Sequence, residues 1–288
     1  MEVRRIGTTT DLLGESCVWS TSEQALYWVD IRQPALRRLN YSDGRVDTFE
    51  MPELAGAVCL REGGGVMMAL QDSIAHFDPV TSSLEKVARA LDTFPDIRFN
   101  DSRVDRQGRF WAGTMDDVAR GAVGTLYRLD SGHRMTAVLH PIVISNSLAF
   151  SPDNRTMYFS DTVSHEIWAY DFDSVSGTPS NRRVFATVPA PATPDGSTVD
   201  AEGYLWNAEW DGARVVRYAP DGQIDRIIPM PVQRPTCCTF GGRDMTTLFV
   251  TTASLRLNAV ERAAQPMAGG LLALEVGVKG VADPAYRP

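Results

Sequence analysis

Residues 26–30 read Leu-Tyr-Trp-Val-Asp, a short apolar and aromatic run that ends in a polar residue. Runs of the same kind recur at residues 66–70, 110–114, 157–161, 205–209 and 248–252. Their equivalent central residues are spaced by 39, 44, 47, 48 and 43 positions, counted through Trp28, Met67, Trp111, Tyr158, Trp206 and Phe249. A period of this length is typical of a repeated four-stranded unit.

Turns and further strands complete each repeat. Most runs follow a turn rich in Gly, Asp or Asn, which permits the positive φ of tight hairpins. A third strand is expected at residues 36–40, 74–78, 124–130, 167–172, 215–220 and 270–276, and a fourth closes most units, as at 183–188 and 224–229. We therefore predict an all-β chain that forms a six-bladed β-propeller with four antiparallel strands per blade, as a single domain over residues 1–288. The alternative is a β-sandwich with coincidental spacing.

The composition is that of an acidic protein with enough apolar material for a large core. Hydrophobic residues make up 43% of the chain, the net charge is −8 and the pI is about 5.1. This balance argues against a nucleic-acid or anionic-membrane partner. The N-terminus lacks the apolar core of a signal peptide, and the four cysteines form no C-x-x-C pair. We expect a cytoplasmic protein with reduced thiols that is a monomer or a weak oligomer.

One polar position recurs at the head of the first strand in four repeats. It is occupied by Glu15, Asn100, Asn146 and Asp195. Because the first strand of every propeller blade lines the central channel, we expect these side chains to meet near the axis and form a metal site there. Their oxygen atoms suit hard divalent ions such as Ca²⁺, Mg²⁺ or Mn²⁺. The alternative is that the Asn and Asp side chains cap turns and that Glu15 is solvated.

Other catalytic groups are missing from the sequence or scattered along it. There is no G-x-S-x-G elbow, no H-E-x-x-H motif and no Walker loop, and the four histidines share no position in the repeat. Acidic residues end the second strand in four repeats. We expect them to surround the mouth of the channel as an acidic rim that binds the hydroxyl groups of a neutral polyol; they are Asp30, Asp116, Asp117, Asp161 and Glu209.

Several motifs occur in order along the chain: residues 13–15 with Trp19, then 98–101, 108–115, 144–146, 180–183, 194–196, 237–242 and 268–270. Together they resemble the regucalcin (senescence marker protein)/gluconolactonase family, from about Leu13 to Val281. The resemblance implies a six-bladed propeller with one divalent metal ion in its channel, in a family whose members include sugar lactonases.

The resemblance also implies roles for individual residues. Glu15, Asn146 and Asp195 correspond to metal ligands, and Asp195 is in addition the candidate general base. Arg98 and Asn100 correspond to residues that contact the substrate, with Asn100 near the metal.

One segment departs from the family pattern. Family members carry paired glutamates after the Gly-Thr-Met motif, one of which reaches the substrate. Here residues 115–118 read Met-Asp-Asp-Val, and Val118 stands where that glutamate would align. Asp116 or Asp117 is the candidate replacement in substrate binding, from a shorter side chain.

The leading hypothesis is a divalent-metal-dependent carboxylic ester hydrolase that opens an aldono-1,4- or 1,5-lactone to the aldonic acid in sugar catabolism. The metal, whether Ca, Mg, Mn, Zn or Fe(II), would polarise the ring carbonyl, and either Asp195 or the metal would activate the attacking water. The alternatives are another ester or organophosphate hydrolase and a non-catalytic Ca²⁺-binding propeller. The sequence leaves open which sugar lactone is the small-molecule partner.

Overall fold

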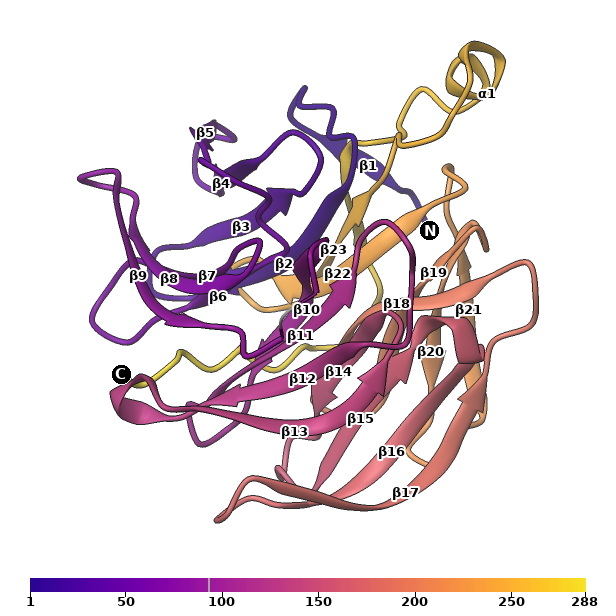
Figure 1. Cartoon of the computed structure of the whole chain (residues 1–288). Coiled ribbons are helices and arrows are strands. Elements are labelled where there is room, and N and C mark those ends of the chain that lie inside the picture. The colour runs from indigo at the N-terminus through magenta and orange to yellow at the C-terminus, as the bar shows by residue number, and fades with distance from the viewer. Residues whose placement is uncertain (93) are drawn as a thin grey trace.

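Six four-stranded antiparallel sheets surround a central axis (Figure 1). The computed structural model describes residues 1–92 and 94–288. We number the sheets as blades 1 to 6 in chain order. The first strands of the six blades, β2, β6, β10, β14, β18 and β22, contact one another around a closed ring, so they line the axis. The predicted six-bladed β-propeller is confirmed.

The strands of blades 1 to 3 are these: β2 (Gly14–Ser20), β3 (Ala25–Asp30), β4 (Ala35–Asn40) and β5 (Val46–Glu50); β6 (Ala57–Leu60), β7 (Val66–Ala69), β8 (Ser73–Asp78) and β9 (Ser83–Arg89); β10 (Ile97–Val104), β11 (Phe110–Asp116), β12 (Gly124–Leu129) and β13 (Met135–Ile142). Those of blades 4 to 6 are β14 (Ser145–Phe150), β15 (Thr156–Asp161), β16 (Glu166–Asp173) and β17 (Thr178–Thr187); β18 (Thr193–Val199), β19 (Leu205–Trp210), β20 (Arg214–Tyr218) and β21 (Ile224–Pro229); β22 (Pro235–Gly241), β23 (Thr247–Thr252), β24 (Leu271–Glu275) and β1 (Arg4–Ile6).

The sixth blade joins the two ends of the chain. Its outermost strand is β1, which pairs antiparallel with β24 in the register Arg4 to Ala273 and Ile6 to Leu271. The sequence repeat did not predict this closure. It joins the first and last blades through hydrogen bonds along one strand pair, in addition to the contacts between their inner strands β2 and β22.

Helical structure is sparse. The 3₁₀ turns η1 (Ser131–His133) and η2 (Thr162–Ser164) lie in hairpin loops, and α1 (Ala259–Ala264) lies between β23 and β24. Asn258 and Glu261 cap the start of α1 by reciprocal side-chain to backbone hydrogen bonds. Over the described part of the chain, no helix has both the length and the apolar character required to cross a membrane.

The aromatic residues that define the repeat are buried in the second strands. Trp28, Trp111 and Trp206 are fully buried. Each indole N–H donates to a buried carboxylate, over 2.8 to 2.9 Å, and the acceptors are Asp11, Asp105 and Asp200. Because a buried indole N–H without a partner would destabilise the core, these acids make the large side chains compatible with burial.

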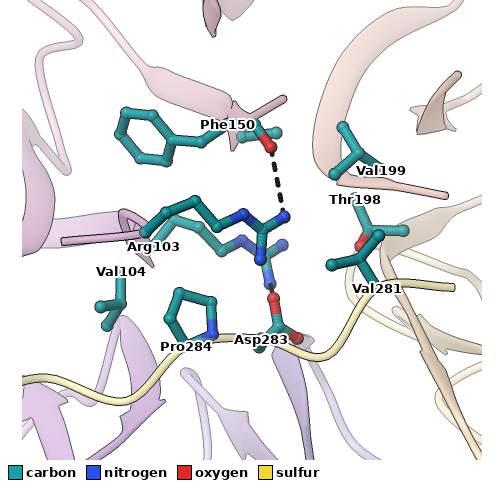
Figure 2. Close-up of a pocket in the computed structure, with 10 residues that line it drawn as sticks. Arg103, Val104, Phe150, Thr198, Val199, Val281, Asp283 and Pro284 are labelled. Atoms are coloured by element: carbon teal, nitrogen blue, oxygen red, sulfur yellow. Dashed lines mark hydrogen bonds and ion pairs between the residues drawn. The ribbon is translucent and has the colours of Figure 1, made fainter. Parts of the chain in front are cut away.

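The segment after β24 closes one end of the channel. It runs beneath the ends of the inner strands, where Arg103 Nη1 lies 3.5 Å from Asp283 Oδ1 and Thr239 Oγ1 donates to Asp283 Oδ2 over 3.0 Å. Figure 2 shows Asp283 facing Arg103 across a cavity of only about 10 Å³. Further on, Tyr286 is fully buried and its hydroxyl donates to the carbonyl of Asp130.

Candidate active site

A much larger cavity, of about 530 Å³, lies at the opposite end of the channel, where the inner strands begin. Strand β10 shows that the two cavities lie at opposite ends. Its first residues border the large cavity, whereas Arg103 and Val104 at its other end border the small one. The large cavity is lined by Glu15, Asn100, Asn146 and Asp195. The fold thus brings the recurring polar positions of blades 1, 3, 4 and 5 to one place.

A β-bulge lies at or directly after each of these positions. The pairing register of the inner strand with the second strand shifts between Glu15 and Val18, Phe99 and Ser102, Asn146 and Ala149, and Pro194 and Ser197. Bulges bend a strand and change the direction of its side chains, and they are frequent beside active sites. Ser16 and Ser147, which directly follow the first and third of these residues, adopt φ of 52° and 57°.

Glu15 and Asp195 form a carboxyl pair on the wall of this cavity. Each side chain influences the pKa of the other, so the two groups lie side by side. Burial, and after it the negative charge of Asp101, raises the pKa of Glu15 to about 8. Burial and the charge of Glu15 raise the pKa of Asp195 well above its ordinary value.

Two carboxamides extend the site through a chain of hydrogen bonds. Arg98 Nη1 donates to Asn100 Oδ1 over 2.6 Å, and Asn100 Nδ2 donates to Asn146 Oδ1 over 2.9 Å. Asn146 Nδ2 then donates to Thr162 Oγ1 over 2.8 Å. These bonds orient the amide oxygen of Asn146 on the same cavity wall as the carboxyl pair.

The donor set fits a hard divalent cation. Two adjacent carboxyl groups with raised pKa values lack a neighbouring positive charge strong enough to keep both ionised, and a cation between them would provide it. Within the residues described, no three His, Cys, Asp or Glu side chains converge as a metal-binding group. A metal held by Glu15, Asn146 and Asp195 would therefore take a carboxamide oxygen as well as two carboxylates, and it stays a prediction.

Asp117 supports Arg98 rather than lining the cavity. It accepts hydrogen bonds from Arg98 Nε (2.6 Å) and from both terminal nitrogens of Arg32 (2.6 and 2.7 Å). Although burial raises the pKa of Asp117, the hydrogen bond from Arg32 and the charge of Arg98 hold it at about 2. Asp116 accepts the backbone N–H groups of Val118 and Ala119, so it stabilises the turn after β11.

The expected acidic rim is wrong. Asp30 is fully buried and accepts four backbone N–H groups, from residues 12, 13, 32 and 33. Asp161 accepts the N–H groups of residues 143 and 144, and Glu209 is buried against Arg214 and Tyr218. These three carboxylates fix loops and ion pairs and are not among the residues that line the cavity.

Arginines border the mouth instead. Arg32, Arg120 and Arg256 line the cavity from the loop after β3, the loop after β11 and the segment after β23. Sequence reasoning missed these arginines, because the loops that carry them differ in length and composition from one repeat to the next.

Fold and cavity together define a six-bladed β-propeller with a pocket of carboxylate and carboxamide oxygens at one end of its channel. The chain belongs to the SMP-30/gluconolactonase/LRE-like family, whose model matches residues 13–254. The resemblance seen in the sequence motifs is thereby confirmed.

Relatives with established names cover nearly the whole chain. A 6-deoxy-6-sulfogluconolactonase of Pseudomonas putida is 41% identical over 277 residues, which is 96% of this chain and 95% of the relative. An L-arabinolactonase of Azospirillum brasilense is 35% identical over 98% of this chain and 94% of its own. The crystal structure of a calcium-binding regucalcin from Agrobacterium tumefaciens superposes with a TM-score of 0.95 at 31% identity, over 100% of this chain and 98% of that one.

Proposed function

We propose that the protein hydrolyses an aldono-1,4- or 1,5-lactone to the aldonic acid and that it requires a divalent metal ion. The observation that carries the proposal is the gathering of Glu15, Asn146, Asp195 and Asn100 on one cavity wall, with Arg98 beside them. The sugar lactonases among the relatives support the reaction class.

The residues of the site would have separate roles in metal binding, proton transfer and substrate binding. Glu15, Asn146 and Asp195 would hold the ion, which when bound supplies a Lewis acid for the lactone carbonyl. Because a cation favours the ionised form of both carboxyl groups, Asp195 can then accept the proton of the attacking water. Arg98 and Asn100 line the cavity and would contact the ring oxygens of the substrate and orient them.

Two alternative functions make different predictions from the lactonase. The regucalcin relative is described as a calcium-binding protein, which favours a non-catalytic Ca²⁺-binding propeller as the second candidate. That candidate predicts ion binding without turnover of any lactone. Hydrolysis of aryl esters or organophosphates in preference to lactones would indicate the other hydrolase class.

The test is a substrate panel on metal-free protein to which single metals are returned. Protein treated with a chelator is assayed by pH-stat on pentono- and hexonolactones, an aryl ester and an organophosphate, with Ca²⁺, Mg²⁺, Mn²⁺ or Zn²⁺ added back. We expect lactone hydrolysis only with metal. Full activity in rigorously metal-free protein would refute the proposal.

Variants connect the activity to the named residues. Glu15→Gln and Asn146→Ala are expected to abolish metal binding and turnover together. Glu85→Gln, an exposed residue of β9, is the control and should change neither.

A further inference from the structure

The arginines at the mouth of the cavity come from three separate blades. Arg32 belongs to blade 1, Arg120 to blade 3 and Arg256 to blade 6. The ion pair of Arg32 with Asp117 joins blade 1 to blade 3 across blade 2, whose inner strand β6 is only four residues long. The positive groups therefore gather over one side of the cavity, above the wall that holds Arg98.

The arginines at this mouth outnumber the carboxylates that are paired with them. Arg32, Arg98 and Arg120 share one carboxylate, that of Asp117, at distances of 2.6, 2.6 and 3.9 Å. Arg256 forms no ion pair within the described part of the chain. Asp211, which also lines the cavity, is paired with Arg234 over 2.7 Å, and the charge of Asp116 acts on Arg120 only weakly.

The arginines also repel one another. Burial and, more weakly, the charges of Arg32 and Arg256 lower the pKa of Arg120, against the influence of Asp117 and the weaker influence of Asp116. Arg120 and Arg256 adopt φ of 56° and 63°, a left-handed conformation that is uncommon for residues with a β-carbon and is enriched at functional sites. A neutral polyol would leave this excess uncompensated, whereas an anionic group would balance it.

We infer that the substrate is a sugar lactone with an anionic substituent, a sulfonate, phosphate or carboxylate, on the part of the sugar remote from the lactone carbonyl. This inference rests on the proposed lactonase activity and specifies its substrate class. The lactone end of such a molecule lies against Asn100, Asn146 and the carboxyl pair, and the anionic end reaches Arg120 and Arg256. Guanidinium groups suit this task because they donate paired hydrogen bonds to planar or tetrahedral oxyanions.

The test compares matched lactones on the metal-loaded protein. The substrates are glucono-1,5-lactone, its 6-phospho and 6-deoxy-6-sulfo derivatives, and a glucarolactone, which separate the three anionic classes. We expect at least one anionic lactone to exceed glucono-1,5-lactone in kcat/KM by roughly 10- to 100-fold, as charge-assisted hydrogen bonds provide. The advantage should shrink in high salt. An anionic advantage of less than about twofold for every derivative would overturn the inference.

Substitutions of the arginines at the mouth test whether they cause the preference for anionic lactones. Arg120→Gln and Arg256→Gln should each reduce the ratio of anionic to neutral kcat/KM about tenfold, mainly through KM, and Arg120→Lys should restore part of it. Arg45→Gln, an exposed arginine paired with Asp47, is the matched control and should leave the ratio unchanged. An unchanged ratio in both mouth variants would contradict the inference.

A binding measurement separates this inference from the lactonase proposal. Calorimetric titration with 6-phosphogluconate, 6-deoxy-6-sulfogluconate, glucarate and gluconate requires no turnover. Tighter binding of any of the first three than of gluconate, lost in Arg120→Gln, supports the anion site even if no lactone is hydrolysed. Equal binding of all four contradicts it even if lactones are hydrolysed.

Discussion

At the scale of single residues, the carboxyl pair of Glu15 and Asp195 would couple the proposed metal binding to the release of protons. With a pKa of about 8, Glu15 of the metal-free protein keeps its proton at neutral pH. Since this folded-state pKa is raised, the contribution of Glu15 to stability is complete below its ordinary pKa and is lost as the pH rises through 8. A divalent ion bound at the proposed site would replace the proton and remove that loss.

Metal affinity should therefore rise with pH and level off above about pH 8. For one displaced proton the rise is about tenfold per pH unit. Calorimetry between about pH 6 and 9, in buffers of different ionisation enthalpy, measures both the affinity and the protons released. An affinity that is flat over this range, with no proton release, would contradict a protonated Glu15 in the metal-free protein.

A second residue-scale prediction concerns Asp117, which holds Arg98 and Arg32. Asp117→Asn leaves the buried guanidinium of Arg98 without its charge partner, so we expect a loss of about 2–3 kcal/mol in the free energy of unfolding and a higher KM. Because the pKa of Asp117 is lowered to about 2, its contribution is present above the ordinary value of 3.8 and is lost as the pH falls through 2.

Urea unfolding at about pH 7 and pH 2 checks this. The difference between wild type and Asp117→Asn should be large at the higher pH and smaller at the lower one. Asp171→Asn, which removes an exposed pair with Arg183, is the comparison and should have little effect. Equal effects of the two substitutions at neutral pH would count against the role given to Asp117.

At the scale of elements, the inner strands must pack closely for their first residues to meet. A β-carbon added at Gly196 would lie 2.5 Å from Cys237 Sγ, so β18 approaches β22 where only glycine fits. Gly196→Ala should displace Asp195, the adjacent residue, by separating these strands. We expect a loss of about 1–3 kcal/mol in stability and at least a tenfold loss in metal affinity.

The control for this substitution is Gly44→Ala. Gly44 lies in a turn remote from the cavity with nothing within 4 Å, but its φ of 72° makes alanine strained there. It should lower thermal stability and leave metal binding intact. Equal metal affinity in both variants would show that close packing at Gly196 does not position Asp195.

The elements themselves were largely predictable. The runs around Trp28, Trp111 and Trp206 predict second strands because a strand with both faces buried needs large apolar side chains. The four axial residues could be selected because they recur in register. The bulges that orient them were missed, although small residues such as Ser16 and Ser147 directly follow two of them and indicate irregular backbone.

Other features carry no repeated signal. β1 has only three residues, Arg-Arg-Ile, and its partner β24 lies at the far end of the sequence. Its pairing is decided by closure of the ring rather than by a local pattern. Arg32, Arg120 and Arg256 lie in loops, where sequence spacing does not determine which side chains meet.

At the scale of the whole molecule, β1 holds the ring closed. Removal of residues 1–6 exposes the edge of β24 and takes away the strand pair between the ends of the chain. We expect the melting temperature to fall by several degrees and unfolding to remain a single transition, as the predicted single domain requires. Tryptophan fluorescence and circular dichroism, recorded together, test both points. Removal of residues 1–2 alone is the control, and separate transitions in the intact chain would argue against one domain.

The segment that carries Asp283 gives the channel a blind end. A lactone that binds as proposed would enter past Arg120 and Arg256 and find no exit at the opposite side, where Arg103 and Asp283 leave room for little more than a water molecule. The aldonic acid formed in the proposed reaction would have to leave through the same opening by which the lactone entered. Substrate and product would thus share one opening. Accumulated acid should then act as a competitive inhibitor that slows turnover as the reaction proceeds.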